Sequence, residues 1–386
     1  MYFHETSGQI PLILYGAGDY GVYIAELLPV VDIIPTAFCD QEKRGICPKT
    51  GIPIISPPEL MSDYPNAYIM ICSENYYDEI WQDISKLGVK TEQIITYEDR
   101  INTILDIDYL KMIFEKKMNY LPNFENPVTF NEKLNWLKLN DRNPVYTKLA
   151  DKLTVREFIA EQIGADYLVP IYGAWDSAEA IDFSSLPEQF VLKCNHDSGS
   201  VVVCHDIRQL DIERAKNKLT KRLNTNYYWR SREWVYKDIT PRIFASKYLG
   251  DNINDYKILT FNGEPKIIQV VYDLFTSQKR NLYTTDWDYL PVSQHFPTDP
   301  LHMINKPANL SKMLELAGIL SQGIPHVRVD FWEVEGQLYF SEFTFYSDGG
   351  FSKFEPYDYD ELLGSWLKLP PPLQARTYVR PNHKPS

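Results

Sequence analysis

The feature that most constrains the fold is a pair of segments in the C-terminal part of the chain, Val327–Phe331 and Ser341–Phe345, in which polar and apolar residues alternate. Successive side chains of a β-strand point to opposite faces, so each segment would have one polar and one apolar face. Glu335-Gly336 between them is typical of a tight turn, which predicts a β-hairpin. The apolar face belongs in a core, and the polar face collects a guanidinium, two carboxylates and a hydroxyl: Arg328, Asp330, Glu342 and Thr344.

Two interpretations of this polar face follow from the residues alone. Carboxylate and hydroxyl oxygens are ligands that suit Mg²⁺, an ion that often binds together with nucleotide phosphates. Charged side chains are usually exposed, however, and the same residues could form a solvated face held by salt bridges. The remainder of the sequence is needed to decide between a metal site and a salt-bridged surface.

Length and charge exclude several classes of protein. With 386 residues the chain is long enough for two or three domains, and 44% hydrophobic with 14% aromatic residues is the composition of a well-packed globular protein. The net charge of −13 argues against nucleic acid as the main partner, because phosphate backbones need basic patches. Small phosphorylated ligands remain compatible with this charge, since they need only a local positive site.

The cysteines and the N-terminal residues bear on where the protein works. Five cysteines without a CxxC pair make a poor disulfide framework, so small buried thiols in a reducing compartment are the simpler interpretation. The N-terminus lacks a basic region followed by a long apolar core, and no apolar run is long enough to span a bilayer. We therefore expect a cytoplasmic protein without a membrane span.

Residues 10 to about 99 alternate between short apolar strands and amphipathic helices, the pattern of a small parallel sheet with helices on both faces. A glycine turn, Gly16-x-Gly18-x-x-Gly21, follows the first strand, and Asp40 ends the second. This spacing is that of a dinucleotide-binding fingerprint, and residues 1–99 resemble the small Rossmann-like domain found beside sugar-modifying enzymes of surface-glycan pathways. A nucleotide or nucleotide-sugar site and a purely structural turn both fit these residues. Strands are expected at residues 10–15, 33–39, 53–55, 68–72 and 94–97, and helices at 22–28 and 75–87.

The rest of the chain divides into a helical lead-in (residues 100–150), an α+β domain (151–368) and a proline-containing tail (369–386). Thr129 and Glu132 have the spacing of a capping box and predict a helix that runs through Leu139. Another helix is expected over residues 152–163. Strands that form antiparallel sheets are expected at residues 169–172, 190–193, 201–204, 243–248, 256–261, 266–272, 326–331 and 338–345.

Two lysines upstream of the hairpin help to decide whether its polar face is a metal site. Lys193 ends an apolar strand and precedes a small polar loop, Asn195–Ser200, whose backbone N–H groups suit a phosphate. A buried ammonium is costly unless it is paired, and a phosphate would pair it; a lysine whose ammonium reaches water is the simpler alternative. Lys152 opens a predicted helix, where the helix dipole disfavours a cation unless an anion lies nearby. His196 in the loop would contact a phosphate or acceptor, or face solvent.

Taken in order, these features resemble the ATP-grasp superfamily. Lys152 is followed by Lys193 with its flexible loop, by a hinge strand at Ser246–Leu249, and by the polar residues of the hairpin. Over residues 125 to about 365, the chain is similar to the TupA-like ATP-grasp family, which is associated with teichuronopeptide and other bacterial surface-polysaccharide biosynthesis. The passages that carry this similarity are Asn126–Trp136, Leu186–Lys193, Asp255–Lys257, Phe261–Gly263 and Arg328–Thr344.

The resemblance implies an α/β Rossmann-like domain followed by an α+β ATP-grasp domain that binds ATP and Mg²⁺. The α- and β-phosphates would be contacted by Lys152 and Lys193, and the loop with Ser198 and Gly199 would close over the triphosphate. The remaining nucleotide contacts would be the backbone of Lys247 and Leu249 for adenine, and Asp255 for the ribose hydroxyls.

Metal ligands and catalytic cations are also implied by the resemblance. Three side chains would hold Mg²⁺: Asp330, Glu342 and Thr344. Three cations would act on phosphoryl groups or other anions: Arg328 at the transferred phosphoryl group, and Lys257 and Arg280 as further contacts. Ser246 stands where the superfamily usually has an acid, and Thr344 where it often has asparagine, so adenine recognition would use another group and a hydroxyl would serve as ligand.

The expected activity is that of an ATP-dependent carboxylate–amine ligase. ATP would phosphorylate a carboxylate, an amine would attack the acylphosphate, and phosphate would leave as the amide forms, while the protein positions groups and neutralises charge. The resemblance suggests a uronic acid and an amino acid or small amine as substrates, in bacterial capsule or other surface-polysaccharide biosynthesis.

Three alternatives remain open on the sequence. The protein would be an ATP-dependent small-molecule kinase if the acceptor differs, or a nucleotide-sugar oxidoreductase or glycosyltransferase if the N-terminal domain carries the activity. A sensor or scaffold with an inactive ATP site is the non-enzymatic alternative. These residues do not identify the substrates, and they do not show whether the protein forms a homo-oligomer.

Overall fold

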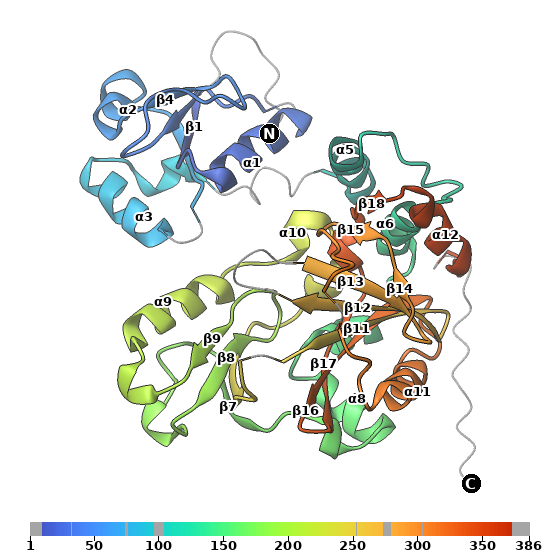
Figure 1. Cartoon of the computed structure of the whole chain (residues 1–386). Helices are drawn as coiled ribbons and strands as arrows, with labels where there is room; N and C mark the ends of the chain where they lie inside the picture. The colour runs from blue at the N-terminus through green and yellow to red at the C-terminus, as the bar shows by residue number, and fades with distance from the viewer. Residues whose placement is uncertain are drawn as a thin grey trace. The chain divides into compact units, whose positions relative to one another are not determined.

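The structure is a computed structural model of the whole chain, and it describes residues 10–31, 33–73, 76–95, 104–251, 253–272, 279–302 and 304–372. Contacts within the chain divide it into two compact units, Met1–Ile113 and Phe114–Ser386. Each unit has its own sheets, as Figure 1 shows. Among the described residues, no helix combines the length and the apolar character that crossing a membrane requires. All five cysteines are free and buried.

The first unit is built on a mixed six-stranded sheet with the order β3-β4-β2-β1-β5-β6. Its neighbouring strands are parallel except for the edge pair β3–β4. The strands are β1 (Leu12–Tyr15), β2 (Ala37–Cys39), β3 (Gly45–Ile46), β4 (Pro53–Ile55), β5 (Tyr68–Ile71) and β6 (Ile94–Ile95). The helices and 3₁₀ turns are α1 (Asp19–Leu27), η1 (Leu28–Val31), α2 (Pro57–Asp63), α3 (Tyr77–Lys86) and η2 (Thr91–Gln93), and α5 (Asp106–Met118) follows.

The alternation of strands and helices predicted for this part is confirmed, with differences at the boundaries. The strand expected at residues 33–39 begins only at Ala37, because Pro35 has no N–H to donate to a ladder. The antiparallel edge strand β3 was not expected, since two residues are too few to show alternation. Residues 96 and 97, expected to end the last strand, lie outside the described residues.

The second unit contains two larger antiparallel sheets. One has four strands in the order β7-β10-β8-β9, and the other has six in the order β14-β13-β12-β11-β16-β17. The smaller sheet consists of β7 (Ile171–Trp175), β8 (Phe190–Cys194), β9 (Val202–Cys204) and β10 (Ile243–Lys247). The larger consists of β11 (Asp255–Phe261), β12 (Glu264–Tyr272), β13 (Lys279–Thr284), β14 (Tyr289–Leu290), β16 (His326–Val334) and β17 (Gln337–Thr344), and β15 (Ser293–Gln294) pairs with β18 (Phe354–Glu355).

Helices cover these sheets. Leu219 of α9 packs in the core of the four-stranded sheet, and α11 buries its apolar side in the core of the six-stranded sheet. Figure 1 shows α9 and α11 in the second unit. The helices are α6 (Phe130–Asn140), α7 (Val145–Ala150), α8 (Val155–Gln162), α9 (Ile212–Leu223), α10 (Tyr228–Ser231), α11 (Leu310–Leu320) and α12 (Asp358–Trp366). The 3₁₀ turns are η3 (Ala165–Tyr167), η4 (Phe183–Ser185), η5 (Ile207–Gln209), η6 (Trp234–Tyr236) and η7 (Ser347–Gly350).

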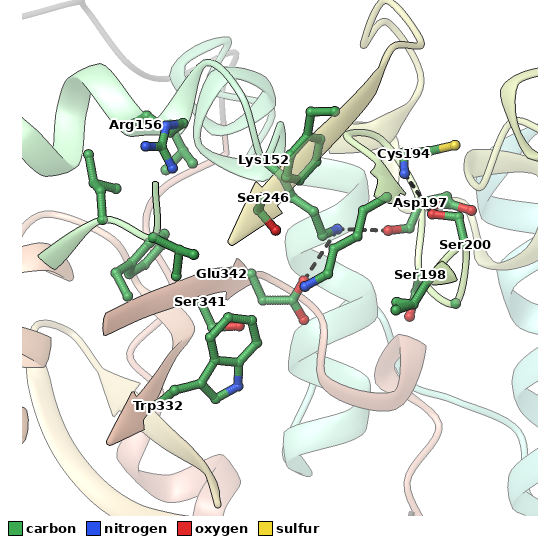
Figure 2. A pocket seen from close by; sticks show the side chains of 18 of the residues that line it. Lys152, Arg156, Cys194, Asp197, Ser198, Ser200, Ser246, Trp332, Ser341 and Glu342 are labelled. Atoms are coloured by element: carbon green, nitrogen blue, oxygen red, sulfur yellow. Dashed lines mark hydrogen bonds and ion pairs between the residues drawn. The ribbon is translucent and has the colours of Figure 1, made fainter. Parts of the chain in front are cut away.

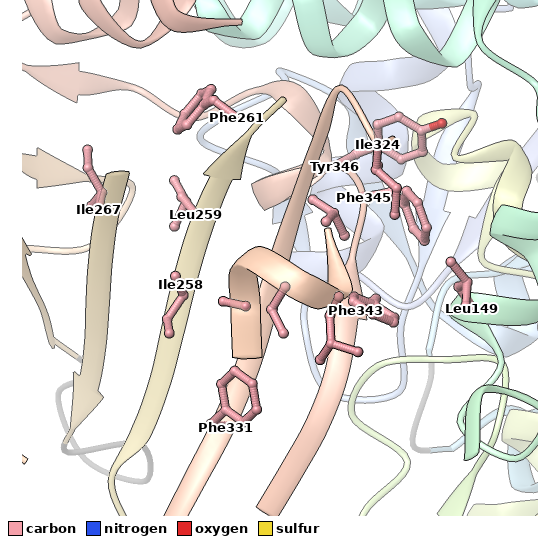
Figure 3. Packing of buried hydrophobic residues seen from close by; sticks show 14 of the residues in the cluster. Leu149, Ile258, Leu259, Phe261, Ile267, Ile324, Phe331, Phe343, Phe345 and Tyr346 are labelled. Carbon is pink, nitrogen blue, oxygen red and sulfur yellow. The ribbon is translucent and has the colours of Figure 1, made fainter. Parts of the chain in front are cut away.

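The hairpin predicted from alternation is confirmed as β16–β17, and its apolar face lies in the largest core (Figure 3). Val327, Val329 and Phe331 are completely buried there, together with Phe343 and Phe345. Of the strands that the sequence did not predict, β13 is the longest. It begins Lys279-Arg280-Asn281, and the burial of these polar residues is not visible from alternation.

The capping box predicted at Thr129 is confirmed. Thr129 Oγ1 accepts the N–H of Glu132 (3.2 Å), and Glu132 Oε2 accepts the N–H of Thr129 (3.1 Å), so α6 begins where the sequence places it. The helix then binds α12, since Asn131 donates from its backbone and its amide to the carboxylate of Asp360 at 3.0 and 2.8 Å. Gly364 of α12 lies against the backbone just before α6, where a methyl group on it would overlap the carbonyl oxygen of Val128.

This close approach gives a stability prediction with a matched control. Gly364→Ala is expected to lower the free energy of unfolding by roughly 2 kcal/mol, because α12 must move away from the backbone at Val128. Gly318→Ala, in α11, has its nearest new neighbours at 3.7 and 3.8 Å and should be neutral or stabilising by up to about 1 kcal/mol. Urea unfolding followed by tryptophan fluorescence measures both, and equal effects would contradict the packing described.

Candidate active site

A β-bulge shapes the polar face of the β16–β17 hairpin. Asp330 pairs with Glu342, and the residue after Asp330 pairs with Phe340, so that Ser341 has no partner of its own. Phe340 and Phe343 are both buried, while Ser341 and Glu342 between them both line a pocket (Figure 2). A regular strand would have put Glu342 on the same face as Phe340, so the bulge is what turns this carboxylate toward the pocket.

Asp330 is completely buried and lies at the centre of an ion cluster. It accepts hydrogen bonds from Arg328 Nε (2.8 Å), Arg328 Nη2 (2.6 Å) and Lys257 Nζ (2.9 Å). Lys257, opposite Asp330 on β11, also contacts Asp255 Oδ2 at 2.5 Å. Burial would lower the pKa of Lys257, but Asp255 and Asp330 raise it. The second oxygen of Asp255, Oδ1, is buried and has no hydrogen-bond partner among the described residues.

Glu342 brings negative charge from this cluster to the pocket. Its Oε2 lies 3.3 Å from Lys152 Nζ, and its Oε1 lies 3.7 Å from Arg328 Nη2. Burial alone would raise the pKa of Glu342, but Lys152, Lys257 and Arg328 together lower it to about 2. Glu342 is therefore an anion throughout the neutral pH range.

Lys152 is fixed by backbone contacts in the turn before α8. Its ammonium donates to the carbonyl oxygen of Asp197 (2.7 Å), and its N–H donates to the carbonyl oxygen of Asn195 (3.1 Å). The sequence predicted a helix from residue 152, but α8 begins only at Val155. The reason is Asp151, whose Oδ1 accepts the N–H of Leu153 (2.8 Å) and holds a turn there.

Lys193 lies in β8, opposite Phe244 of β10, and lines the same pocket. Its ammonium sits 4.7 Å from the centroid of the Trp332 ring, a cation–π contact, and no described carboxylate lies within ion-pair distance of it. Burial, with the positive charge of Lys152, lowers the pKa of Lys193 to about 8. Within the described part of the chain, Lys193 thus has no anionic partner.

The conformation of the loop after Lys193 is fixed by hydrogen bonds of its own polar side chains. Ser200 Oγ accepts the N–H of Cys194 (2.8 Å) and donates to Asp197 Oδ1 (2.6 Å). Asn195 donates to Asp151 Oδ1 (2.9 Å) and so ties the loop to the turn at Lys152. At the tip, the exposed residues Ser198 and Gly199 line the pocket, and Gly199 has a φ of +93°, which favours glycine.

His196 does not face a ligand or solvent as the sequence suggested. It is buried, and its Nε2 lies 3.2 Å from the carbonyl oxygen of Arg222 and 3.1 Å from that of Thr225. His196 therefore fixes the loop to the end of α9. The apolar strand and the polar residues after it predicted a phosphate-binding loop. They did not show which side chains of the loop would be buried in the protein.

The strand β10 closes another wall of the pocket. Ser246 lines it, whereas Lys247 and Leu249 are not among the lining residues. The N–H of Lys247 donates to the carbonyl oxygen of Pro170 (2.9 Å), so this donor is already used. The roles predicted for the backbone of Lys247 and Leu249 stay predictions.

Figure 2 shows how the labelled residues are spread along the pocket. Ser198 and Ser200 of the loop lie at one end, Arg156 lies at the other, and Lys152 and Glu342 lie between them. Of the residues predicted for the site, those that line the pocket are Lys152, Lys193, Ser198, Gly199, Asp255 and Glu342. Arg328 and Lys257 lie behind this wall, in contact with Glu342 and Asp255 respectively, and both contact the buried Asp330.

Several lining residues were missed by the sequence analysis. Trp332 alternates with Asp330 along β16, so the period of the strand could have placed it on the polar face. Ser341 could also have been found, because the apolar residues stand at even-numbered positions up to Phe340 and at an odd-numbered position from Phe343. Such a change shows that one extra residue lies between them. Arg156 and the apolar residues Val155, Leu168, Val169 and Phe340 carry no such signal of function.

Two predicted site residues lie elsewhere. Arg280 donates to Asp348 Oδ2 (2.8 Å), to Asp348 Oδ1 (3.2 Å) and to the carbonyl oxygen of Gln294 (3.2 Å), and it does not line the pocket. The charge of Arg280 is therefore neutralised by Asp348, away from the pocket. Thr344 pairs with Arg328 on the hairpin and also lies outside the pocket lining.

In the first unit, the glycine turn is closed by the carboxylate predicted to bind a ligand. Asp40 accepts the N–H of Ala17 through Oδ2 (2.8 Å) and the N–H groups of Glu42 and Lys43 through Oδ1 (both 3.0 Å). Burial would raise the pKa of Asp40, but these backbone donors lower it. The glycines permit tight packing, since Gly16 has a φ of +110° and a methyl on Gly21 would overlap the Gly16 carbonyl oxygen; Gly18 precedes α1. These contacts favour the structural interpretation of the turn.

The burial of Asp330 gives a prediction. Asp330→Asn leaves Arg328 and Lys257 facing a neutral amide and should lower the free energy of unfolding by roughly 3 kcal/mol. Asp176→Asn is the matched control, because the Asp176–Arg242 contact of 2.7 Å involves side chains that are 85% and 40% exposed. That change should cost less than about 1 kcal/mol in the same urea titration. Similar losses for the two variants would refute the central place of Asp330.

Comparisons with known proteins were made for the whole chain. The family model described as TupA-like ATPgrasp matches residues 132–368. No curated protein sequence matches. Among solved structures, D-alanine–D-alanine ligase from Bacillus anthracis complexed with ATP is 12% identical, covering 86% of this chain and 84% of that one with a TM-score of 0.31. L-amino acid ligase from Bacillus licheniformis is 14% identical, covering 97% and 79% with a TM-score of 0.36.

The region matched by the family model contains both sheets of the second unit and every residue that lines the pocket. Lys152, Lys193, the polar loop and Glu342, which follow one another along the sequence, all line this one pocket. The chain belongs to the TupA-like ATP-grasp family and is an ATP-grasp ligase.

Proposed function

We propose that the second unit is an ATP-dependent carboxylate–amine ligase that works through an acylphosphate. The observation that carries this proposal is Lys193, a half-buried cation that lines the pocket and has no carboxylate of the described residues within ion-pair distance. A triphosphate is the anion that would satisfy it, and the exposed tip of the loop, Ser198-Gly199, is placed to cover such a ligand.

The charges around the pocket support a metal–triphosphate ligand. The charged groups that line the pocket or lie directly behind it are five cations and four carboxylates, which leaves one positive charge in excess: Lys152, Arg156, Lys193, Lys257 and Arg328, and Asp197, Asp255, Asp330 and Glu342. A free triphosphate would overload this cluster with negative charge, whereas a magnesium-bound one would come closer to balancing it. The unpartnered Oδ1 of Asp255 is in turn an acceptor suited to a ribose hydroxyl.

The fit of the side chains to Mg²⁺ is uneven. Among the described residues, no three or more His, Cys, Asp or Glu side chains surround a common point. Glu342 fits, because it is an anion on the pocket wall. Asp330 fits less well, because Arg328 binds both of its oxygens and Lys257 binds one of them. It could join the ion only if these cations shift, and Asp255 is a second partner that Lys257 already contacts. We propose that Glu342 holds the ion and Asp330 joins it, with Thr344 as a weaker candidate; when bound, the ion would neutralise charge on the phosphates.

The side chains would then act by position and charge. The substrate carboxylate oxygen attacks the γ-phosphorus, the bond to ADP breaks, and the acylphosphate forms. The amine nitrogen next attacks the acyl carbon, loses a proton, and expels inorganic phosphate as the amide forms. Lys152 and Lys193 would hold the phosphates in line, and Arg328 would keep Glu342 and Asp330 in place through its contacts with both carboxylates.

The substrate class follows from the family resemblance alone. We propose that a uronic acid is the carboxylate and an amino acid or small amine is the acceptor, in the biosynthesis of a bacterial surface polysaccharide. The five free thiols are compatible with a reducing, ATP-containing compartment, which would be the cytoplasm.

The first unit is proposed to be Rossmann-like. Its five parallel strands have the order β4-β2-β1-β5-β6, and the glycine turn follows the central strand β1, which supports that topology. Binding of a nucleotide sugar there stays a prediction, and the internal contacts of Asp40 favour a structural role for the turn.

The activity predicts a defined set of products. Purified protein with Mg²⁺ should release ADP and phosphate only when a carboxylate and an amine are both present, and Lys193→Ala and Glu342→Gln should reduce this turnover at least about 100-fold. Phosphorus NMR of the products separates the alternatives, because a kinase would accumulate a phosphorylated acceptor without free phosphate. Absence of Mg-ATP binding, or full activity in Lys193→Ala, would refute the ligase proposal.

A second prediction uses the lowered pKa of Lys193. At pH 8 the free ammonium is about half deprotonated, and a bound triphosphate would raise its pKa again, so binding should take up about half a proton. At pH 6 the lysine is already protonated, and uptake should be close to zero. Calorimetry in two buffers of different ionisation enthalpy measures this difference, and Lys193→Met should abolish it. Equal uptake by wild type and Lys193→Met would show that another group titrates.

A further inference from the structure

Arg156 is a charged residue of the pocket to which no role has been given. It is the second residue of α8, and its side chain lines the pocket together with its neighbour Val155. In Figure 2, Arg156 lies at the end away from Ser198 and Ser200, with Lys152 and Glu342 in between. If the phosphates lie at the loop and the two lysines, Arg156 is at the end where the nucleobase would lie.

The guanidinium of Arg156 lacks a partner within the described part of the chain. No carboxylate, carbonyl oxygen or aromatic ring of the described residues contacts it, and burial lowers its pKa. Other arginines contrast with it: Arg328 is bound to Asp330, and Arg242 to Asp176. A half-buried guanidinium with unused N–H donors is costly, and a ligand that offers acceptors would remove this cost.

The apolar residues of the pocket lining suit a planar ring. The isolated bridge between Leu168 and Phe340 brings these two apolar residues together, and both line the pocket with Val155 and Val169. Ser246 contributes a hydroxyl from β10 to the same pocket. A largely apolar pocket with a few polar groups is the usual form of a site for an aromatic ligand, and Arg156 is one of the charged residues in this lining.

The donor pattern distinguishes between purines. Guanine and hypoxanthine present two neighbouring acceptors, O6 and N7, which match the parallel N–H donors of a guanidinium. Adenine presents N7 beside the N6 amino group, and that amino group is itself a donor. A guanidinium at this edge therefore favours a 6-oxopurine over adenine.

We propose that Arg156 binds the nucleobase and that this pocket accepts 6-oxopurine nucleoside triphosphates, GTP and ITP, as well as ATP. The inference rests on the proposed triphosphate site at Lys152 and Lys193. It adds a specificity-determining residue at the opposite end of that site.

The experiment compares binding of ATP, GTP, ITP and inorganic tripolyphosphate, each with Mg²⁺, to the full chain by calorimetry. Arg156→Ala should weaken GTP and ITP about tenfold or more, ATP less than about threefold, and tripolyphosphate not at all. Arg156→Lys should behave like Arg156→Ala toward GTP, because lysine keeps the charge but loses the planar fork. Arg214→Ala, an exposed arginine on α9, is the control and should change none of these affinities.

The outcomes separate this inference from the proposed function. If tripolyphosphate and ATP bind and Lys193→Ala weakens both, while Arg156→Ala changes GTP and ATP equally, the ligase site stands and the base-selecting role of Arg156 is refuted. A loss of tripolyphosphate binding in Arg156→Ala would place this residue at the phosphates, which also refutes it. If the wild type binds none of the four ligands, the triphosphate site fails and Arg156 loses its role with it.

Discussion

The structure of the second unit depends on one buried carboxylate, Asp330, held between the guanidinium of Arg328 and the ammonium of Lys257. Three charges in a core are tolerated only when each is paired, because removing an ion from water costs several kcal/mol that only close contacts return. The contacts bridge β11 and β16, so they also fix the register of the central strands. Lys257 and Arg328 of this group also act with Lys152 to lower the pKa of Glu342, which keeps a negative charge on the pocket wall.

The hairpin could be predicted from the sequence because its apolar residues alternate over enough positions to leave little ambiguity. Lys193 and its loop were predicted for a similar reason: an apolar strand that ends in a lysine and a polar loop is a local pattern. The bulge at Ser341 was missed, although Phe340 and Phe343 already record it as a change of parity. Local sequence patterns thus predicted the strands. Counting the spacing of the apolar residues along β17 would also have predicted its β-bulge.

Contacts between residues far apart in sequence could not be predicted. Arg280 was assigned to the site as a cation, but Asp348, 68 residues later, neutralises it. Asp40 matches the acid of a nucleotide fingerprint, yet backbone N–H groups of the folded turn already occupy it. Arg156 shows the opposite case, since its lack of a partner is evident only once its neighbours are in place. Which charges remain available to a ligand is decided by the tertiary structure.

The pairing of α6 with α12 has a consequence for the architecture of the chain. Asn131 binds Asp360, and Lys133 donates to the carbonyl oxygens of Gly364 and Leu367 at 2.8 and 2.9 Å. The helix near the start of the second unit, α6, is therefore bonded to its last helix, α12. The two ends of the unit lie side by side, and both of its larger sheets lie between them in the sequence. Such a unit can be carried as a self-contained module, joined to different upstream segments or circularly permuted at a surface turn, without opening its core.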